Sequence, residues 1–231
     1  NTGLLHAFHQ HNYSLANCSV IMSGKITDNH LKMLEKFFNR SDSGNASFNP
    51  QIPAPKANNE REHLIVKKDA IQSAIRMGRA LFPKNHPDWI GMQILNTVLG
   101  GYFASRLNAN IREDKGYTYG IGSALVPLQQ HGYFVIATEV GADVCSAAIH
   151  EIYTEIDRLQ NDLIPDEEIG LVRNHLSGSL LRSTDGPFAL ADRLKGVINY
   201  GLGYDYYDRY LHTIKTITPE QLRVLAQTYL N

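Results

Sequence analysis

The sequence contains only two cysteines, Cys18 and Cys145, which lie far apart and form no CxxC pair. This spacing excludes a zinc ribbon and a disulfide-stapled scaffold, so we expect both cysteines to be small buried apolar residues. A chain of 231 residues needs neither kind of crosslink. A chain of this length buries roughly 70% of its unfolded surface and can form a sizeable core.

An excess of charge and long apolar runs are also missing. The 22 Lys and Arg residues are balanced by 23 Asp and Glu residues. Because binding to phosphates needs clustered cations, we expect no nucleic-acid partner. No segment approaches the roughly 18 consecutive apolar residues that cross a bilayer, and we therefore expect no membrane span.

The first 60 residues differ in character from the rest. Ala16–Gly24 reads as a short buried strand, and Thr27 is placed to cap a helix with an apolar face, so residues 1–45 are predicted to form a helix-strand-helix tail. Residues 41–60 hold three of the nine prolines and almost no apolar periodicity. That composition is typical of a linker, which we place at residues 46–60.

Residues 61–231 alternate between strand and helix signals. The predicted elements are strands at 63–67 and 71–81, helices at 86–99 and 104–113, a hairpin of strands at 117–126 and 132–140, and then helices to the end. Thr218-Pro-Glu-Gln221 has capping-box spacing and predicts the start of the last helix. This order predicts an α+β fold with a mostly antiparallel sheet covered on one face by helices.

A weak internal sequence similarity suggests how these parts are related. The final residues, LAQTYLN, resemble AFHQHNYSLAN at residues 7–17, which lead directly into the strand predicted at 16–24. We expect residues 1–45 to be the tail of a preceding homologous domain and residues 61–231 to be a copy that lacks its last strand. A missing strand would leave a free sheet edge, and the segment 17–24 is a candidate to fill it.

The most distinctive stretch is LGGYFASRLNANIREDKGYTYGIGS at residues 99–123. It resembles the LGG…SRL…IRE..G..Y…S signature of the pitrilysin/insulinase (inverzincin) family of zinc metallopeptidases, in the half-domain that lacks the metal. The flanking pattern of strands and helices agrees, so the resemblance covers essentially the whole chain. It implies a clamshell of repeated α+β domains, with zinc on one half and substrate-binding groups on the other.

In that family the zinc half carries H-x-x-E-H on a helix, where two histidines bind zinc and the glutamate polarises water. This sequence has no such motif, and the nearest approach is Asn59-Glu-Arg-Glu-His63 in the predicted linker. His6, His9 and His11 could suggest another metal site, but no carboxylate or cysteine lies nearby at ligand spacing. We interpret them as exposed histidines, and expect no catalytic residue and no metal in this chain, with zinc in the partner half.

The resemblance also implies an arginine and a tyrosine seven residues apart that contact the substrate across the closed chamber. Arg112 and Tyr119 have that spacing, with Gly116 between them, and Tyr117 is an alternative tyrosine. Residues 117 and 119 point to the same face of a strand, so geometry does not separate them. A guanidinium and a phenol can both donate hydrogen bonds to a peptide carbonyl and to a developing oxyanion. The alternative interpretation is structural: Arg112 pairs with an acidic neighbour, and the tyrosines are ordinary strand residues.

The function implied is that of a non-catalytic, substrate-binding half-domain of a zinc-dependent endopeptidase. Its partners would be a peptide or small protein substrate and the zinc-bearing half-domain or subunit. A second possibility remains open, in which the parent protein is an inactive structural or partner subunit of a peptidase or of a larger complex.

Overall fold

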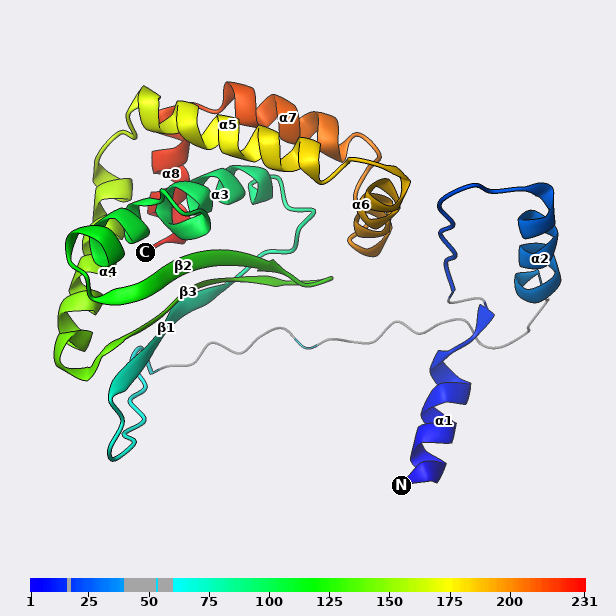
Figure 1. Ribbon diagram of the computed structural model, residues 1–231, viewed down its shortest axis with the longest axis horizontal. Helices are drawn as coiled ribbons and strands as arrows, with labels where there is room; N and C mark the ends of the chain where they lie inside the picture. Colours follow the sequence, from blue (N-terminus) through cyan, green and yellow to red (C-terminus); the bar gives the residue numbers. More distant parts are fainter. Residues whose placement is uncertain (16–17, 40–52, 54–59) are drawn as a thin grey trace. The chain divides into compact units, whose positions relative to one another are not determined.

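The computed structural model describes residues 1–15, 18–39, 53 and 60–231 (Figure 1). The chain divides into two units, Asn1–Pro53 with Ser183–Lys195, and Ala54–Arg182 with Gly196–Asn231. The predicted linker at 46–60 lies outside the described residues, apart from Pro53 and Glu60. No helix among the described residues is long and apolar enough to cross a membrane.

The first unit contains helices α1 (Thr2–Asn12) and α2 (Asp28–Phe38), and α2 begins after Thr27 as predicted. The strand predicted at 16–24 is wrong for its described residues, because 18–23 have no strand structure and the Val20 side chain is 46% exposed. A strand is stable only when a neighbour takes up its backbone hydrogen bonds, and no such pairing is made here. Cys18 is also exposed rather than buried.

The second unit contains an antiparallel sheet of β1 (Gln72–Leu81), β2 (Thr118–Pro127) and β3 (Gly132–Gly141) in the order β1-β3-β2. The predicted hairpin is confirmed as β2 and β3, which pair from Pro127↔Gly132 at the turn. β1 pairs with the other edge of β3 along its full length. The central strand of the sheet is thus the last of the three in sequence.

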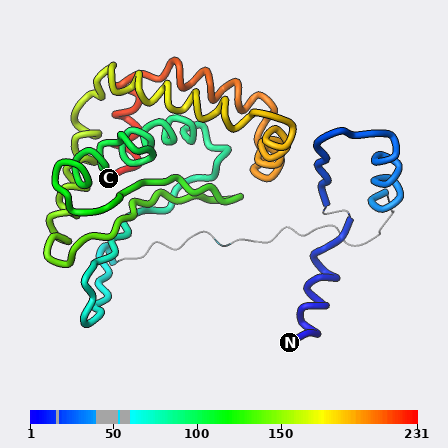
Figure 2. The backbone as a smooth tube through the Cα atoms, in the orientation of Figure 1, coloured from blue at the N-terminus to red at the C-terminus, as the bar shows by residue number. Residues whose placement is uncertain are grey.

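Helices cover one face of this sheet (Figures 1 and 2). The helical elements of this unit are α3 (Trp89–Asn96), the π-helices η2 (Thr97–Gly101) and η3 (Asn108–Asp114), the 3₁₀ turn η4 (Ala142–Val144), α4 (Cys145–Asn161), α5 (Asp166–Arg182), α7 (Tyr206–Thr216) and α8 (Pro219–Tyr229). Of these, α5 and α7 lie over α3, on its side away from the sheet (Figure 1). Helix α6 (Pro187–Asn199) begins in the first unit and ends in the second. The capping box predicted for the last helix is present, since Gln221 N donates to Thr218 Oγ1 at 3.3 Å.

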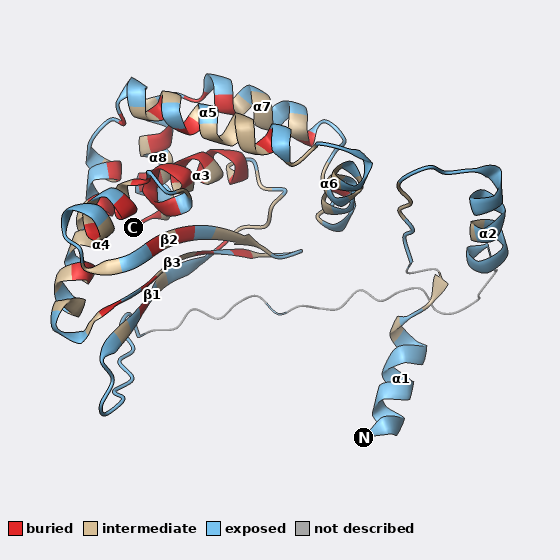
Figure 3. Ribbon diagram, viewed as in Figure 1, coloured by how far each residue is buried: buried red, intermediate tan, exposed pale blue. Residues whose placement is uncertain are grey.

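The core lies between the sheet and these helices (Figure 3). Alternate side chains of β3 face it, with Phe134, Ile136 and Val140 at most 5% exposed. Apolar side chains of α3 and α4, such as Ile94 and Ile152, complete it from the helical layer. Alternation of buried and exposed side chains along a strand is typical of an antiparallel sheet that is buried on one face. The predicted α+β class is therefore confirmed.

The strand predicted at His63–Lys67 is wrong. Its apolar residues Leu64, Ile65 and Val66 are 86%, 80% and 78% exposed, and the segment has no strand structure. A turn separates it from β1, with Ala70 N donating to Lys67 O at 3.4 Å. The β-branched residues of the segment predicted a strand. The backbone does not form one, because no neighbouring strand supplies hydrogen bonds to it.

Candidate functional site

The segment that carries the family signature folds as helix, turn, helix and strand. α3 continues into η2, and a turn at 102–105 leads into η3, in which Lys115 N donates to Asn110 O at 2.9 Å, five residues back. π-Helical turns are rare and are found disproportionately at functional sites. Gly116 then adopts φ +66°, a left-handed conformation that glycine tolerates without strain, and turns the chain into β2.

Arg112 lies on η3 with its guanidinium between two aromatic rings. Its Cζ atom is 4.5 Å from the centroid of the Phe103 ring and 5.9 Å from that of Tyr119. Within the described part of the chain no carboxylate pairs with this guanidinium, and the neighbouring Asp114 carboxylate lies 3.7 Å from Lys115 Nζ. The structure thus brings Arg112 and Tyr119 together and does not show the alternative pairing of Arg112 with an acidic neighbour.

Tyr119 is exposed because β2 carries an irregularity at this point. Thr118 pairs with Val140 and Ile121 with Thr138, so Tyr119 and Gly120 have no partner residue on β3. The Thr118 hydroxyl donates to Glu139 O at 2.7 Å, which fixes the strand on one side of the bulge. Bulges redirect side chains and recur beside active sites. Here the Tyr119 side chain is 96% exposed.

Tyr117 has a different environment from Tyr119. It lies just before β2, its side chain is half-buried against the core, and its backbone N donates to Ile111 O at 3.0 Å. The sequence argument placed residues 117 and 119 on the same face of one strand, and this is wrong because the strand begins at Thr118 and is then bulged. Of the two tyrosines, Tyr119 is the one beside Arg112.

Polar contacts anchor η3 to the helices behind it. Arg106 donates from Nε and from an Nη atom to the two oxygens of Glu168 on α5, both at 2.8 Å. Burial alone would lower the pKa of Arg106, but the hydrogen bonds and the charge of Glu168 outweigh it and raise that pKa. Burial, followed by the charge of Glu168, also raises the pKa of Tyr102. A bidentate arginine–carboxylate pair fixes both distance and orientation.

A second anchor lies on the α4 side of η3. Asn110 Nδ2 donates to Glu155 Oε1 at 2.7 Å and to Glu151 Oε2 at 3.0 Å. Glu155 is only 3% exposed, and Arg158 donates to it at 2.8 Å. Sequence reasoning identified neither Phe103 nor these anchoring residues. The spacing of these residues along the chain gives no sign that they are in contact.

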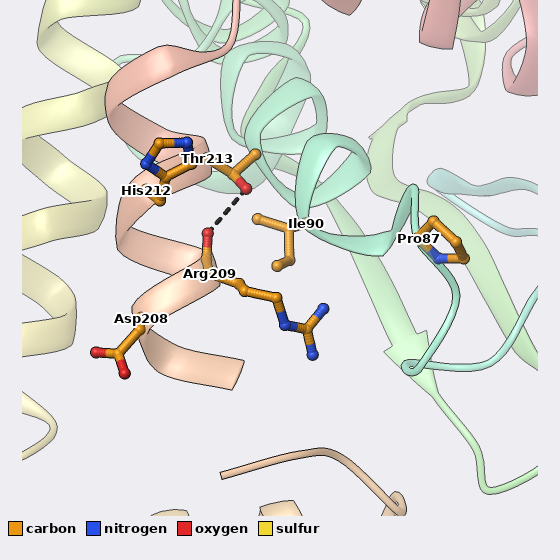
Figure 4. Close-up of a pocket in the computed structure, with 6 residues that line it drawn as sticks. All are labelled: Pro87, Ile90, Asp208, Arg209, His212 and Thr213. Atoms are coloured by element: carbon orange, nitrogen blue, oxygen red, sulfur yellow. Dashed lines mark hydrogen bonds between the residues drawn. The ribbon is translucent and has the colours of Figure 1, made fainter. Parts of the chain in front are cut away.

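A cavity of about 450 Å³ lies elsewhere on this unit (Figure 4). It is lined by Pro87, Ile90, Asp208, Arg209, His212 and Thr213. The lining cation, Arg209, is paired with Asp205 at 2.8 Å, and the Thr213 hydroxyl donates to Arg209 O at 2.8 Å. Both of these contacts are made within α7 and its N-cap, and none of the residues singled out by the sequence lines this cavity.

No group of three or more His, Cys, Asp or Glu residues that could hold a metal occurs among the residues with described positions. In the N-terminal helix, His9 stacks on Tyr13 with ring centroids 5.0 Å apart. The candidate site is therefore a half-buried guanidinium, that of Arg112, beside two exposed aromatic rings, and its N–H groups and the Tyr119 hydroxyl can donate to a ligand oxygen.

Comparison with known proteins decides the family. Residues 3–176 match the model described as the peptidase M16 inactive domain. The chain belongs to this family. The predicted resemblance to the non-metal half-domain of the pitrilysin/insulinase-type zinc peptidases is confirmed.

Relatives of this peptidase M16 inactive domain bear zinc-protease names. The chain is 25% identical to an uncharacterized zinc protease of Mycobacterium leprae (strain TN), over 98% of this chain and 52% of the relative. It is 26% identical to the uncharacterized zinc protease YmxG of Bacillus subtilis (strain 168), over 95% of this chain and 53% of the relative. The chain thus spans about half the length of these relatives.

Solved structures share the fold. The peptidase M16 inactive domain from Pseudomonas fluorescens matches with a TM-score of 0.64 and 24% identity, over 69% of this chain and 38% of that chain. A protease from Helicobacter pylori matches with a TM-score of 0.73 and 15% identity, over 90% of this chain and 51% of that chain. The sheet with its helical layer is therefore an arrangement of the inactive M16 domain.

Proposed function

We propose that this chain is the non-catalytic, substrate-binding half of a zinc-dependent endopeptidase, and that Arg112 and Tyr119 bind the peptide. The observation that carries the proposal is the position of Arg112. Its guanidinium lies beside the exposed rings of Phe103 and Tyr119, and no described carboxylate pairs with it. Its N–H groups are thus available to a ligand on the surface.

The chemistry fits peptide-bond hydrolysis. Attack on a peptide carbonyl moves negative charge onto its oxygen, and donors aimed at that oxygen stabilise the transition state. A guanidinium supplies charge and several N–H groups, and the Tyr119 hydroxyl supplies a further donor. The described residues of this chain offer no zinc site, so in this proposal the metal is held by the zinc-bearing half, on the same polypeptide or on a partner subunit.

The proposal extends to the domain organisation. Residues 1–45 would be the tail of a preceding homologous domain, and residues 61–231 the substrate-binding domain. The exposure of Leu4, Phe8 and Phe37, at 71%, 58% and 51%, supports this assignment. Apolar side chains gathered on short helices are typical of a surface that packs against more protein.

The test begins with the full-length protein that contains this chain. Zinc content and hydrolysis of quenched fluorescent peptides are measured for it alone and mixed with a homologous zinc-bearing subunit. Activity of the protein alone would indicate that both halves lie on one polypeptide, and activity only on mixing would indicate a two-chain peptidase. Absence of hydrolysis in both settings would contradict the proposal and favour an inactive partner subunit.

Substitutions then test the site. Arg112→Ala should lower kcat/KM by a factor of about 10 to 1000, the range for loss of one oxyanion donor. Tyr119→Phe should lower it in the same direction, whereas Tyr117→Phe should leave it unchanged, because Tyr117 packs inward. Arg209→Ala is the matched control, since this arginine pairs with Asp205 far from the site. Unchanged turnover in Arg112→Ala would contradict the binding role and indicate that Arg112 has a structural role only.

A further inference from the structure

We propose that Phe103 determines substrate specificity at the Arg112 site. In this proposal its exposed ring packs against an apolar side chain of the bound peptide, next to the carbonyl that Arg112 contacts. The substrate class would then be peptides with an aromatic or large aliphatic residue at that position. This inference rests on the proposed function, because it takes Arg112 to be the residue that binds the peptide.

Phe103 is an exposed ring on a fixed turn. Its side chain is 67% exposed, and it is not part of the core cluster. The adjacent Tyr102 is half-buried against the core, and its ring lies 4.9 Å from that of His175 between centroids, tilted by 38°. Ser105 N and Asn108 Nδ2 both donate to Tyr102 O, at 3.2 and 3.3 Å, so the backbone that carries Phe103 is held.

The ring contributes two surfaces to the site. One carries the guanidinium of Arg112, whose Cζ atom lies 4.5 Å from the ring centroid. Arginine stacks on aromatic faces and keeps its N–H groups for hydrogen bonds. The remainder of the ring faces solvent. An apolar side chain that packed there would remove its own surface and that part of the ring from water. A cation and an apolar surface side by side match a peptide carbonyl and its neighbouring side chain.

The surroundings leave room for a peptide backbone. A Cβ atom added at Gly116 or at Gly120 would meet no atom within 4 Å. Both glycines lie beside the two binding residues, Gly116 between Arg112 and Tyr119 in sequence and Gly120 next to Tyr119 on the bulge. Open space above side-chain-free backbone allows close approach of another main chain.

A purely structural role for Phe103 gives a different expectation. If the ring only holds the Arg112 guanidinium, its removal weakens the binding of all peptides to the same extent. If the ring also binds a substrate side chain, its removal weakens the binding of peptides that have a large apolar residue at that position more than the binding of peptides that have alanine at the same position. The selectivity ratio between two such peptides therefore separates the two roles.

The test compares peptides that differ at one residue, Phe against Ala, scanned through each position on either side of the cleaved bond. In the full-length active protein, Phe103→Ala should lower kcat/KM about 10-fold for the preferred Phe peptide and about 2-fold for its Ala partner, mainly through KM. Phe103→Leu should keep most of the selectivity, because it keeps an apolar side chain. Phe188→Ala is the control, since that ring is 71% exposed on the other unit.

Equilibrium binding of the same peptides to the zinc-stripped full-length protein supplies a readout without turnover. The Kd of the Phe peptide should rise about 10-fold in Phe103→Ala while that of the Ala peptide changes little. An unchanged ratio of Kd values would overturn the specificity role. If Arg112→Ala lowers turnover while Phe103→Ala leaves selectivity intact, only this inference fails. If Arg112→Ala changes nothing, the proposed function fails as well.

Discussion

Gly100→Ala should destabilise the protein, although alanine is normally the better helix residue. Gly100 lies in η2 where this helix crosses β2, and it is buried. A Cβ atom at this position would lie 2.7 Å from the backbone N of Ser123, 2.6 Å from its hydroxyl and 2.9 Å from Leu107 Cδ1. The backbone atom belongs to a paired strand and Leu107 is fully buried, so neither neighbour can move aside easily.

The magnitude follows from two opposing terms. Replacing glycine by alanine in a helix contributes about 0.5–1 kcal/mol of stability. Forcing an extra methyl group into a well-packed core costs about 1–3 kcal/mol. The difference between these ranges is a loss of about 0–2.5 kcal/mol in the free energy of unfolding, and its middle, about 1 kcal/mol, is the effect expected for Gly100→Ala. For a chain of this size a loss of about 1 kcal/mol corresponds to a decrease in Tm of about 2–4 °C.

Gly170→Ala is the matched control. Gly170 lies within α5, and a Cβ atom there would meet nothing within 4 Å, so only the favourable helix term applies. Denaturant unfolding followed by circular dichroism should show a gain of about 0.5–1 kcal/mol for this variant. A gain of the same size in Gly100→Ala would refute the reasoning, because it would mean that η2 and β2 do not approach as closely as the structure shows.

Substitutions at three further positions test the anchors of the fold. Arg106→Ala leaves the Glu168 carboxylate half-buried without its bidentate partner and should lower the free energy of unfolding by about 2 kcal/mol, with Arg106→Lys at an intermediate value, measured by denaturant titration. The hydroxyl of Tyr229 donates to Asp88 at 2.6 Å, and this bond, together with burial, raises the pKa of Tyr229 to about 12. The stability it contributes is complete below the ordinary phenol pKa of about 10 and is lost as the pH rises from about 10 to about 12. The difference in unfolding free energy between the parent and Tyr229→Phe should shrink over that range, and a constant difference would contradict the assignment. Thr218→Ala removes the cap of α8 and should lower stability by about 1 kcal/mol in the same titration, whereas no change would show that the cap is dispensable.

The sequence predicted those parts of the fold that local signals specify. Segments rich in Tyr, Thr, Val and Ile on either side of the loop at 127–131 predicted β2 and β3, and the spacing from Thr218 predicted α8. The segments at 18–23 and 63–67 carry the same apolar composition but form no strand. Composition records the tendency of a segment to be buried in a sheet, whereas strand formation depends on a partner elsewhere in the chain.

The candidate site was predictable in its residue types and not in its geometry. Arg112 and Tyr119 were found through the family signature, and the structure places them together. Period-2 reasoning did not separate Tyr117 from Tyr119, because a bulge is invisible when only one strand is read. Phe103 was missed for a related reason. It approaches Arg112 only because a turn and a π-helix bring together residues nine positions apart.

The contrast between Arg112 and its neighbours bears on why this surface suits a ligand. Arg106 pairs with Glu168 on α5, and Arg158 pairs with Glu155 within α4, each at 2.8 Å. Had Arg112 been paired in the same way, a peptide would have to displace a carboxylate before it could bind, and that cost would be subtracted from the affinity. Stacking on aromatic rings restricts the guanidinium without occupying its N–H groups. The Arg106–Glu168 pair therefore helps to fix the turn that leads into η3, whereas Arg112 keeps its hydrogen-bonding capacity for an oxygen outside the chain. The proposed peptide binding would require this preorganisation.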